Sequence, residues 1–296
     1  MMGKRNEKDL NELFIAYSED FAECEQTIRK HSKSFYRAFA QLPKQKAWSV
    51  FAVYSFCREA DDIIDVYNDL GRLTLLEKEL TEFLSGNIPD RYFWRALVPV
   101  FETYKMEPQA FYDMLTGQKM DWDFQQPETQ EQLEEYSYYV AGSVGLMLLP
   151  ILSNQAEKVK NQGIQLGQAM QITNILRDIG EDFKNQRIYL PKEVMKKYHV
   201  TLDTLKHERI DESFIKLWEY EAMRAEKLYQ GAKSMISDID SDCQEALLLS
   251  AAFYEGILDA VRKNNYQCFN TRNYVKKSQQ LKLYQDVKKQ LNTSFN

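Results

Sequence analysis

The segment READDIID, residues 58–65, places three aspartates at helical spacing directly after a run of apolar residues. A second segment of the same kind, QITNILRDIGED, spans residues 171–182. An α-helix turns by about 100° per residue, so Asp61 and Asp65 share one helix face, and Asn174, Asp178 and Asp182 share another. The two segments therefore predict two helices that each present a row of oxygen-bearing side chains in one direction.

Such rows of carboxylates are unfavourable by themselves. Like charges four residues apart destabilise a helix by a few tenths of a kcal/mol. A lone acidic pair is usually a solvated surface, but here apolar runs at residues 48–57 and 164–172 lead into both segments. Charge on a mostly buried helix needs a partner. Because the ligands are all hard oxygens, we expect several Mg²⁺ ions, with Mn²⁺ as a substitute.

Composition excludes several classes of protein. The chain has 296 residues and a net charge of −6, without the basic stripe of a nucleic-acid binder. The first residues are charged, unlike a signal peptide, and the longest apolar run, residues 144–152, is too short to span a membrane. The four cysteines show no C-x-x-C spacing and indicate reduced thiols. We expect a cytoplasmic protein.

Helical periodicity runs through most of the chain, and alternating strand patterns are nearly absent. We predict a single all-α domain over residues 1–296, with a poorly ordered N-terminus over 1–15. The expected helices lie near residues 20–40, 44–67, 72–84, 92–105, 108–120, 130–152, 155–183, 191–198, 201–206, 212–236, 242–264 and 271–290.

Two acidic helices, bound Mg²⁺ and an apolar interior together favour one reaction type, the ionisation of an allylic diphosphate. Cations neutralise the charge of the leaving group. The carbocation that remains needs a dry pocket, where aromatic faces stabilise it by about 2 kcal/mol or more. The 18 tyrosines and 16 phenylalanines of this chain are enough to line such a pocket, although aromatic residues in helices are usually core residues.

Five segments of the sequence resemble the squalene/phytoene synthase family. They are HSKSF at residues 31–35, YSFCREADDIID at 54–65, YSYYVAGSVG at 136–145, QITNILRDIGED at 171–182 and NQRIYLP at 185–191. The resemblance covers most of the chain. It implies a single helical bundle of the isoprenoid-synthase type around a central cavity.

The resemblance also implies a reaction, and the likeness is greatest to bacterial family members that make C30 products. In that reaction two farnesyl diphosphates condense head to head, through presqualene diphosphate, to dehydrosqualene (4,4′-diapophytoene), the first step of C30 carotenoid synthesis. We see no nucleotide motif and expect no NADPH. The alternatives are phytoene synthase, which couples two geranylgeranyl diphosphates, bacterial squalene synthase, and a catalytically inactive helical assembly factor.

Residue roles follow from the same resemblance. The expected metal ligands are Asp61, Asp65, Asn174, Asp178 and Asp182. The diphosphate contacts are His31, Lys33, Ser34, Arg58 and Arg272. The residues at the reacting centre, besides Arg58, are Tyr54, Tyr136, Gln171, Tyr189 and Tyr254. The borders of the hydrocarbon tunnels are Phe35, Phe39, Phe51, Val140, Ala141 and Gly145.

Two further features lie beside these motifs. Asp62 and Glu181 point away from the aligned carboxylates, so we expect them to pair with Arg58, Arg177 or a lysine. The C-terminal segment carries Lys276, Lys277, Lys282, Lys288 and Lys289. We expect this segment to form a solvated helix. The functional alternative is weak docking of the helix on an anionic membrane. A downstream carotenoid desaturase is a further partner that the resemblance implies.

Overall fold

A computed structural model describes residues 7–294, and within them the chain forms helices and no strand. The α-helices are α1 (Glu7–Ala16), α2 (Ser18–His31), α3 (Lys33–Phe39), α4 (Lys44–Asp65), α5 (Leu70–Leu84), α6 (Tyr92–Thr103), α7 (Pro108–Trp122), α8 (Gln130–Ser137), α9 (Ser143–Leu152), α10 (Lys160–Lys184), α11 (Lys192–Lys197), α12 (Leu202–Lys206), α13 (Glu212–Lys233), α14 (Gln244–Lys263) and α15 (Lys277–Ser294). A π-helix, η1 (Tyr138–Gly142), joins α8 to α9, and two short 3₁₀ turns are η2 (Ala156–Val159) and η3 (Ile236–Asp238). The all-α prediction is confirmed.

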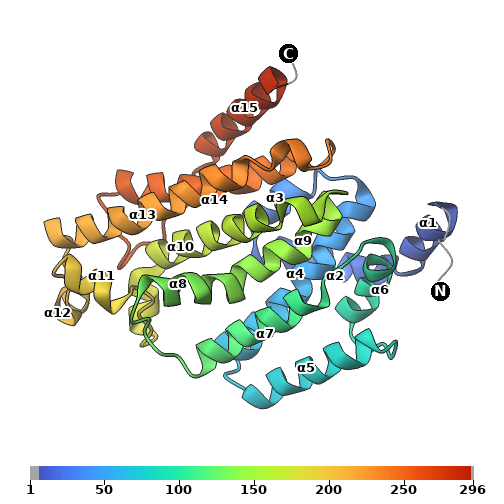
Figure 1. The fold of residues 1–296 in the computed structure, drawn as a ribbon, viewed down its shortest axis with the longest axis horizontal. Coiled ribbons are helices and arrows are strands. Elements are labelled where there is room, and N and C mark those ends of the chain that lie inside the picture. Colours follow the sequence, from blue (N-terminus) through green and yellow to red (C-terminus); the bar gives the residue numbers. More distant parts are fainter. Residues whose placement is uncertain (1–6, 295–296) are drawn as a thin grey trace.

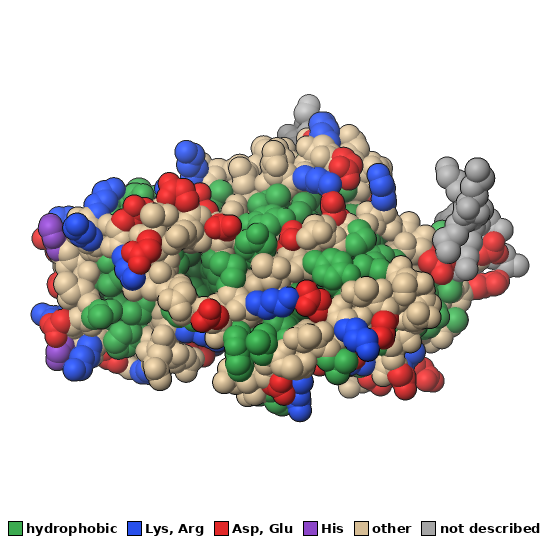
Figure 2. All heavy atoms as spheres, turned by 60° about the horizontal axis from the view of Figure 1, so that its bottom comes forward, with side chains coloured by type: hydrophobic (Ala, Val, Ile, Leu, Met, Phe, Trp, Pro, Cys, Tyr) green, Lys and Arg blue, Asp and Glu red, His purple; other side chains and the backbone are tan. Residues whose placement is uncertain are grey.

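The long helices lie side by side around the centre of the molecule. In Figure 1, α13 and α14, α10, α8 with α9, and α7 follow one another across the view, with α4 behind them. The last helix, α15, projects from the edge next to α14. Acidic and basic side chains are interspersed on the face seen in Figure 2, with apolar areas between them. None of the described helices is both long and apolar enough to cross a bilayer.

Three helix boundaries differ from the sequence-based expectation. The helix expected over residues 20–40 is broken at Ser32, whose backbone is extended (φ −140°, ψ 85°). The last helix begins at Lys277 instead of residue 271. The poorly ordered segment expected over 1–15 is wrong for its second part, which forms α1, while residues 1–6 lie outside the described residues.

Helices α9 and α10 cross at very short distance, and glycines make this possible. A Cβ atom added at Gly145 would lie 2.3 Å from the carbonyl oxygen of Gly163. One added at Gly167 would lie 2.1 Å from the carbonyl oxygen of Ala141 in η1. Side chains at either position would force the helices apart. The crossing fixes η1 against α10, next to the cavity described below.

Candidate active site

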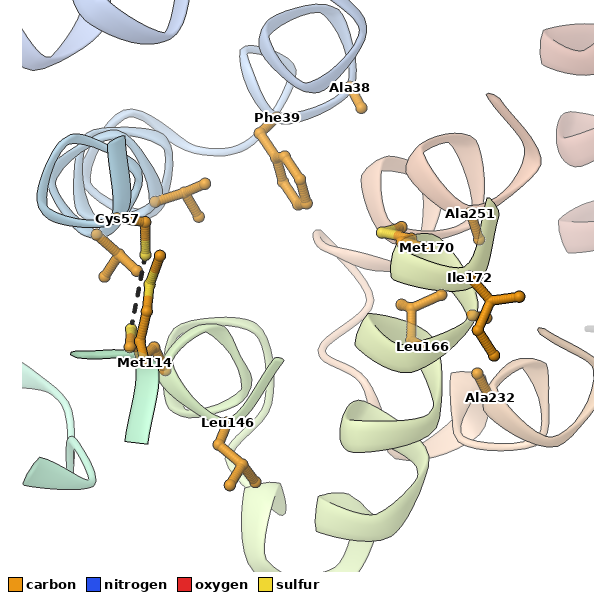
Figure 3. Packing of buried hydrophobic residues seen from close by; sticks show 14 of the residues in the cluster. Ala38, Phe39, Cys57, Met114, Leu146, Leu166, Met170, Ile172, Ala232 and Ala251 are labelled. Carbon is orange, nitrogen blue, oxygen red and sulfur yellow. Dashed lines mark hydrogen bonds between the residues drawn. The ribbon is translucent and has the colours of Figure 1, made fainter. Parts of the chain in front are cut away.

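An apolar cavity runs between α3, α4, η1, α9, α10 and α14. About 1100 Å³ of space free of protein atoms lies within it, including space that is open to solvent. Figure 3 shows Phe39 of α3 on one side of this central region and Leu166 and Met170 of α10 on another. The apolar lining residues are Phe35, Phe39, Val50, Val53, Cys57, Met114, Val140, Ala141, Val144, Gly145, Leu148, Leu149, Leu152, Gly163, Leu166, Gly167, Met170, Met235 and Leu247. The cavity has room for a long hydrocarbon chain.

One end of this cavity opens into a polar basin. Side chains of Phe35, Tyr54, Asp61, Asn174 and Tyr254 line both spaces. The positively charged and hydroxyl-bearing residues around the basin are His31, Lys33, Ser34, Arg37, Arg58, Arg177, Arg272 and Lys277. Five of these residues, His31, Lys33, Ser34, Arg58 and Arg272, are the expected diphosphate contacts, and the structure brings them together. An anionic group in the basin would therefore adjoin an apolar chain in the cavity.

The first acidic cluster ends α4 at the junction of basin and cavity. Burial, and then the charge of Asp65, raise the pKa of Asp61 to about 8. Asp61 accepts a hydrogen bond from Nε2 of Gln118 (2.8 Å), and Asp65 accepts one from Nη1 of Arg187 (2.8 Å). Asp62 pairs with Arg58, as expected from the helical wheel.

The second acidic cluster lies on the last turns of α10, which are bent. Asp178 has non-helical backbone angles (φ −108°, ψ 15°), so the straight wheel does not hold through Asp182. Asp178 accepts from Nε of Arg177 (2.8 Å) and lies 3.7 Å from Nη2 of Arg272. Burial, and then the charge of Asp178, raise the pKa of Asp182 to about 8.

One expectation for this cluster is corrected by the structure. Glu181 pairs with Arg272 at 3.3 Å, and not with Arg58, Arg177 or a lysine. The extended segment before α15 passes along α10, since the backbone N–H of Gly180 donates to the carbonyl of Cys268 (3.1 Å). That contact brings Arg272 beside the carboxylates.

The expected metal ligands fit a hard divalent cation in their chemistry. Within residues 7–294 no three His, Cys, Asp or Glu side chains are gathered closely enough to hold a metal ion, and arginines pair with Asp178 and Asp65. Two observations nevertheless favour a cation. The Oδ1 atom of Asn174 is buried without a hydrogen-bond partner. Asp61 and Asp182 have raised pKa values, which a positive charge would reverse.

The residues expected at the reacting centre divide into two groups. Tyr54, Gln171 and Tyr254 line the apolar cavity. Tyr136 and Tyr189 instead line a neighbouring cavity beside α7, and their rings stack at 5.0 Å. The structure therefore does not place all five around one space.

Sequence reasoning missed the residue that holds these two tyrosines. Asp121 accepts hydrogen bonds from the hydroxyls of Tyr136 (3.0 Å) and Tyr189 (2.8 Å). Burial raises the pKa of Asp121 to about 6. The available signal was an aspartate near the end of α7, eight residues after Asp113 and in a polar stretch of the helix. Such a signal is too weak to single out one residue.

The expected tunnel borders are mostly in place, with one correction. Phe35, Phe39, Val140, Ala141 and Gly145 line the cavity. Phe51 does not: it is buried on α4, and its ring lies 5.9 Å from that of Tyr36. A helical wheel cannot tell which of two neighbouring interior spaces a buried side chain enters.

An all-helical fold with two acidic helix ends beside one apolar cavity defines a class of prenyl-diphosphate enzymes. The family model of squalene/phytoene synthases matches residues 28–279, and this chain belongs to that family. It is 34% identical over 281 residues to a 4,4′-diapophytoene synthase of Staphylococcus haemolyticus (strain JCSC1435), covering 92% of this chain and 97% of that one.

Two other relatives extend the comparison. A 15-cis-phytoene synthase of Synechococcus elongatus (strain ATCC 33912 / PCC 7942 / FACHB-805) is 31% identical over 274 residues, with 87% of this chain and 89% of the relative covered. The crystal structure of a dehydrosqualene synthase in complex with a ligand superposes with a TM-score of 0.93 at 48% identity, covering 95% of this chain and 99% of the other. These similarities agree with the family expected from the motifs.

Proposed function

We propose that this chain couples two farnesyl diphosphates head to head, through presqualene diphosphate, to dehydrosqualene. One observation carries the proposal. Asp61 from the first acidic cluster and Asn174 from the second border the junction between a polar basin and an apolar cavity. The similarity to a 4,4′-diapophytoene synthase and to a dehydrosqualene synthase supports the C30 product.

The basin residues bind and orient the diphosphate. When bound, Mg²⁺ held by Asp61, Asp65, Asn174, Asp178 and Asp182 supplies positive charge where the leaving group develops negative charge. Arg58 and Arg272 offer planar, multidentate donors to phosphate oxygens, and Lys33 offers a point charge. Burial, followed by the charge of Arg58, lowers the pKa of His31, which also lines the basin.

The cavity protects the cation that forms when the C1–O bond breaks. Its walls exclude water, so the cation survives until C1 attacks the double bond of the second substrate. Tyr54, Tyr254 and Phe35 present aromatic faces near the junction, and the rings of Phe35 and Tyr254 are 5.3 Å apart. Such faces stabilise a desolvated cation. The first diphosphate has by then left with both electrons of the C1–O bond, and loss of a proton closes the ring of presqualene diphosphate. Ionisation of the remaining diphosphate, rearrangement and loss of a second proton give dehydrosqualene.

The basic helix α15 supports a weaker part of the proposal, peripheral contact with an anionic membrane. Val287 is buried against the body, whereas Leu281 is 61% exposed and Lys288 is half exposed. A hydrocarbon product partitions into lipid, where a carotenoid desaturase would take it up. Co-sedimentation with anionic vesicles, compared with neutral ones, tests the contact. Binding that is equal for both vesicle types, or absent, would contradict it.

The function is tested with radiolabelled farnesyl diphosphate and the purified protein. We expect diphosphate release and a C30 hydrocarbon when Mg²⁺ is present. Failure to consume farnesyl diphosphate under any metal condition, by protein that melts cooperatively, would contradict the proposal and favour the inactive assembly factor.

A further inference from the structure

The apolar cavity has a direction, and a short segment of chain lies beside its far end. On α4 the lining residues run from Asp61 at the basin back to Val50, about 16 Å along the helix axis. On α14 they run from Tyr254 back to Leu247. The far end is therefore bordered by Val50, Leu152 and Leu247. Residues 237–243, between Met235 and Leu247, lie just beyond it.

Lys46 makes several of the contacts that hold residues 237–243 in place. Nζ of Lys46, one turn before Val50 on α4, contacts Oδ2 of Asp240 (2.9 Å), Oδ1 of Asp242 (2.8 Å) and Sγ of Cys243 (3.3 Å). The Lys46 side chain is only 17% exposed. The two carboxylates raise the pKa of Lys46 against the effect of burial. Without the lysine, Asp240 and Asp242 would face each other uncompensated.

The same segment is fixed to the end of α9. The backbone N–H of Asp240 donates to the carbonyl of Leu152 (3.0 Å), and its Oδ1 accepts from the N–H of Asn154 (3.1 Å). The segment therefore joins the ends of α4, α9 and α14, which are the helices that border the far end. Its residues Ile239 and Cys243 are buried.

We propose that the contact of Lys46 with Asp240 and Asp242 is a specificity determinant, which holds residues 237–243 across the end of the cavity and so limits the length of the prenyl chain. The closure lies one helical turn, about 5 Å, beyond the last lining residue of α4, comparable to the length that one more isoprene unit requires. Lys46 touches no substrate and acts by positioning the segment. The inference rests on the proposed function for the nature of the ligand.

The first experiment measures the segment itself. Lys46→Met keeps the aliphatic stem and removes the charge, and hydrogen-exchange mass spectrometry follows residues 237–243. We expect faster exchange in Lys46→Met and near-normal exchange in Lys46→Arg, which retains both ion pairs. The matched control is Lys158→Met, because Lys158 pairs with Asp238 of the same segment from an exposed position. Unchanged exchange in Lys46→Met would overturn the positioning role.

The second experiment measures selectivity without turnover, by calorimetric binding of the non-reactive thiodiphosphate analogues of farnesyl (C15) and geranylgeranyl (C20) diphosphate. We expect Lys46→Met to shift the C20-to-C15 affinity ratio about tenfold toward C20, and Lys46→Arg and Lys158→Met to leave it unchanged. In the double variant Asp242→Asn/Lys46→Met, the change in the C20-to-C15 affinity ratio should be smaller than the two single changes combined.

The two ways of failing are distinct in this design. If wild-type protein binds neither analogue, the proposed function is wrong. If wild-type protein binds them and the ratio stays constant although exchange accelerates, the segment does not limit chain length, and the Lys46 contacts are only structural.

Discussion

Nη1 of Arg187 donates to Oδ1 of Asp65 at 2.8 Å, across 122 positions of sequence. Arg187 follows α10 and Asp65 ends α4, so this pair ties the chain beyond the second acidic cluster to the first. Nη2 of Arg187 also donates to the carbonyl of Asp121 (3.3 Å). Arg187 and Arg58 thus balance part of the charge of the first cluster. A cation that binds Asp65 must therefore compete with Arg187.

Metal removal is the first test. EDTA should abolish turnover, and Mg²⁺ or Mn²⁺ should restore it, because the ligands are hard oxygens. Mg²⁺ should also raise the melting temperature of wild type but not of a variant with Asn at Asp65 and Asp178. Full turnover in EDTA, or a strict need for zinc, would contradict the metal assignment.

Single Asp→Asn substitutions separate catalysis from folding. At Asp61, Asp65, Asp178 or Asp182 we expect the rate to fall about 100-fold or more, as when a group that stabilises transition-state charge is removed. The melting temperature without metal should hold or rise for Asp61→Asn and Asp182→Asn, whose charge burial disfavours. It should fall modestly for Asp65→Asn and Asp178→Asn, which lose an arginine partner. Asp123→Asn, at an exposed neighbour of Asp121, serves as the control. Steep loss of stability with normal rate per folded molecule would mean that these aspartates are structural.

Two phenylalanines of similar burial should behave differently. Phe39 lines the cavity and Phe51 does not, although both are at most 2% exposed. Truncation to Ala should destabilise the protein by about 3–5 kcal/mol in both cases. Only Phe39→Ala should gain C40 product from geranylgeranyl diphosphate. Urea unfolding measures the loss of stability, and product chromatography measures the C40 product. An equal gain of C40 product in Phe51→Ala would contradict the placement of Phe51 outside the cavity lining.

The sequence carried enough information for the fold class and for most of the site. A helical period of 3.6 residues predicts which side chains of one helix share a face, and Asp61 and Asn174 both border the junction of basin and cavity. Helices α8 and α9 were expected as one, and the π-turn between them, which carries Val140 and Ala141 to the cavity, was not visible in the apolar pattern. The kink at Asp178 likewise depends on tertiary contacts.

Hydrogen-bond and ion-pair partners that are far apart in the sequence were the hardest features to predict. Asp121 lies 68 positions from Tyr189, and Glu181 lies 91 from Arg272. No local periodicity encodes such pairs, since they depend on how the chain turns after each helix. The helical wheel correctly paired Asp62 with Arg58 because both lie on one helix.

Glu221 provides a test of pH dependence away from the acidic clusters. It is 1% exposed and has no cationic partner among the residues that the structure describes, and burial raises its pKa from 4.5 to about 7. Because the folded state binds this proton more tightly, stability should be full at low pH and fall as pH rises from about 4.5 through 7, by on the order of 3 kcal/mol.

The matched variants isolate that contribution. Glu221→Gln should flatten the difference in unfolding free energy between pH 5 and pH 8, whereas Glu212→Gln, on the exposed first turn of the same helix, should leave it as in wild type. Chemical unfolding at both pH values provides the measurement. An unchanged slope in Glu221→Gln would refute the assignment.

The central claim is that the protein couples two C15 units without reduction. The most direct measurement offers equimolar farnesyl and geranylgeranyl diphosphates with Mg²⁺, with and without NADPH, and identifies the hydrocarbon by chromatography. We expect mainly dehydrosqualene from farnesyl diphosphate in both cases. Phytoene as the main product, or squalene once NADPH is supplied, would contradict the account.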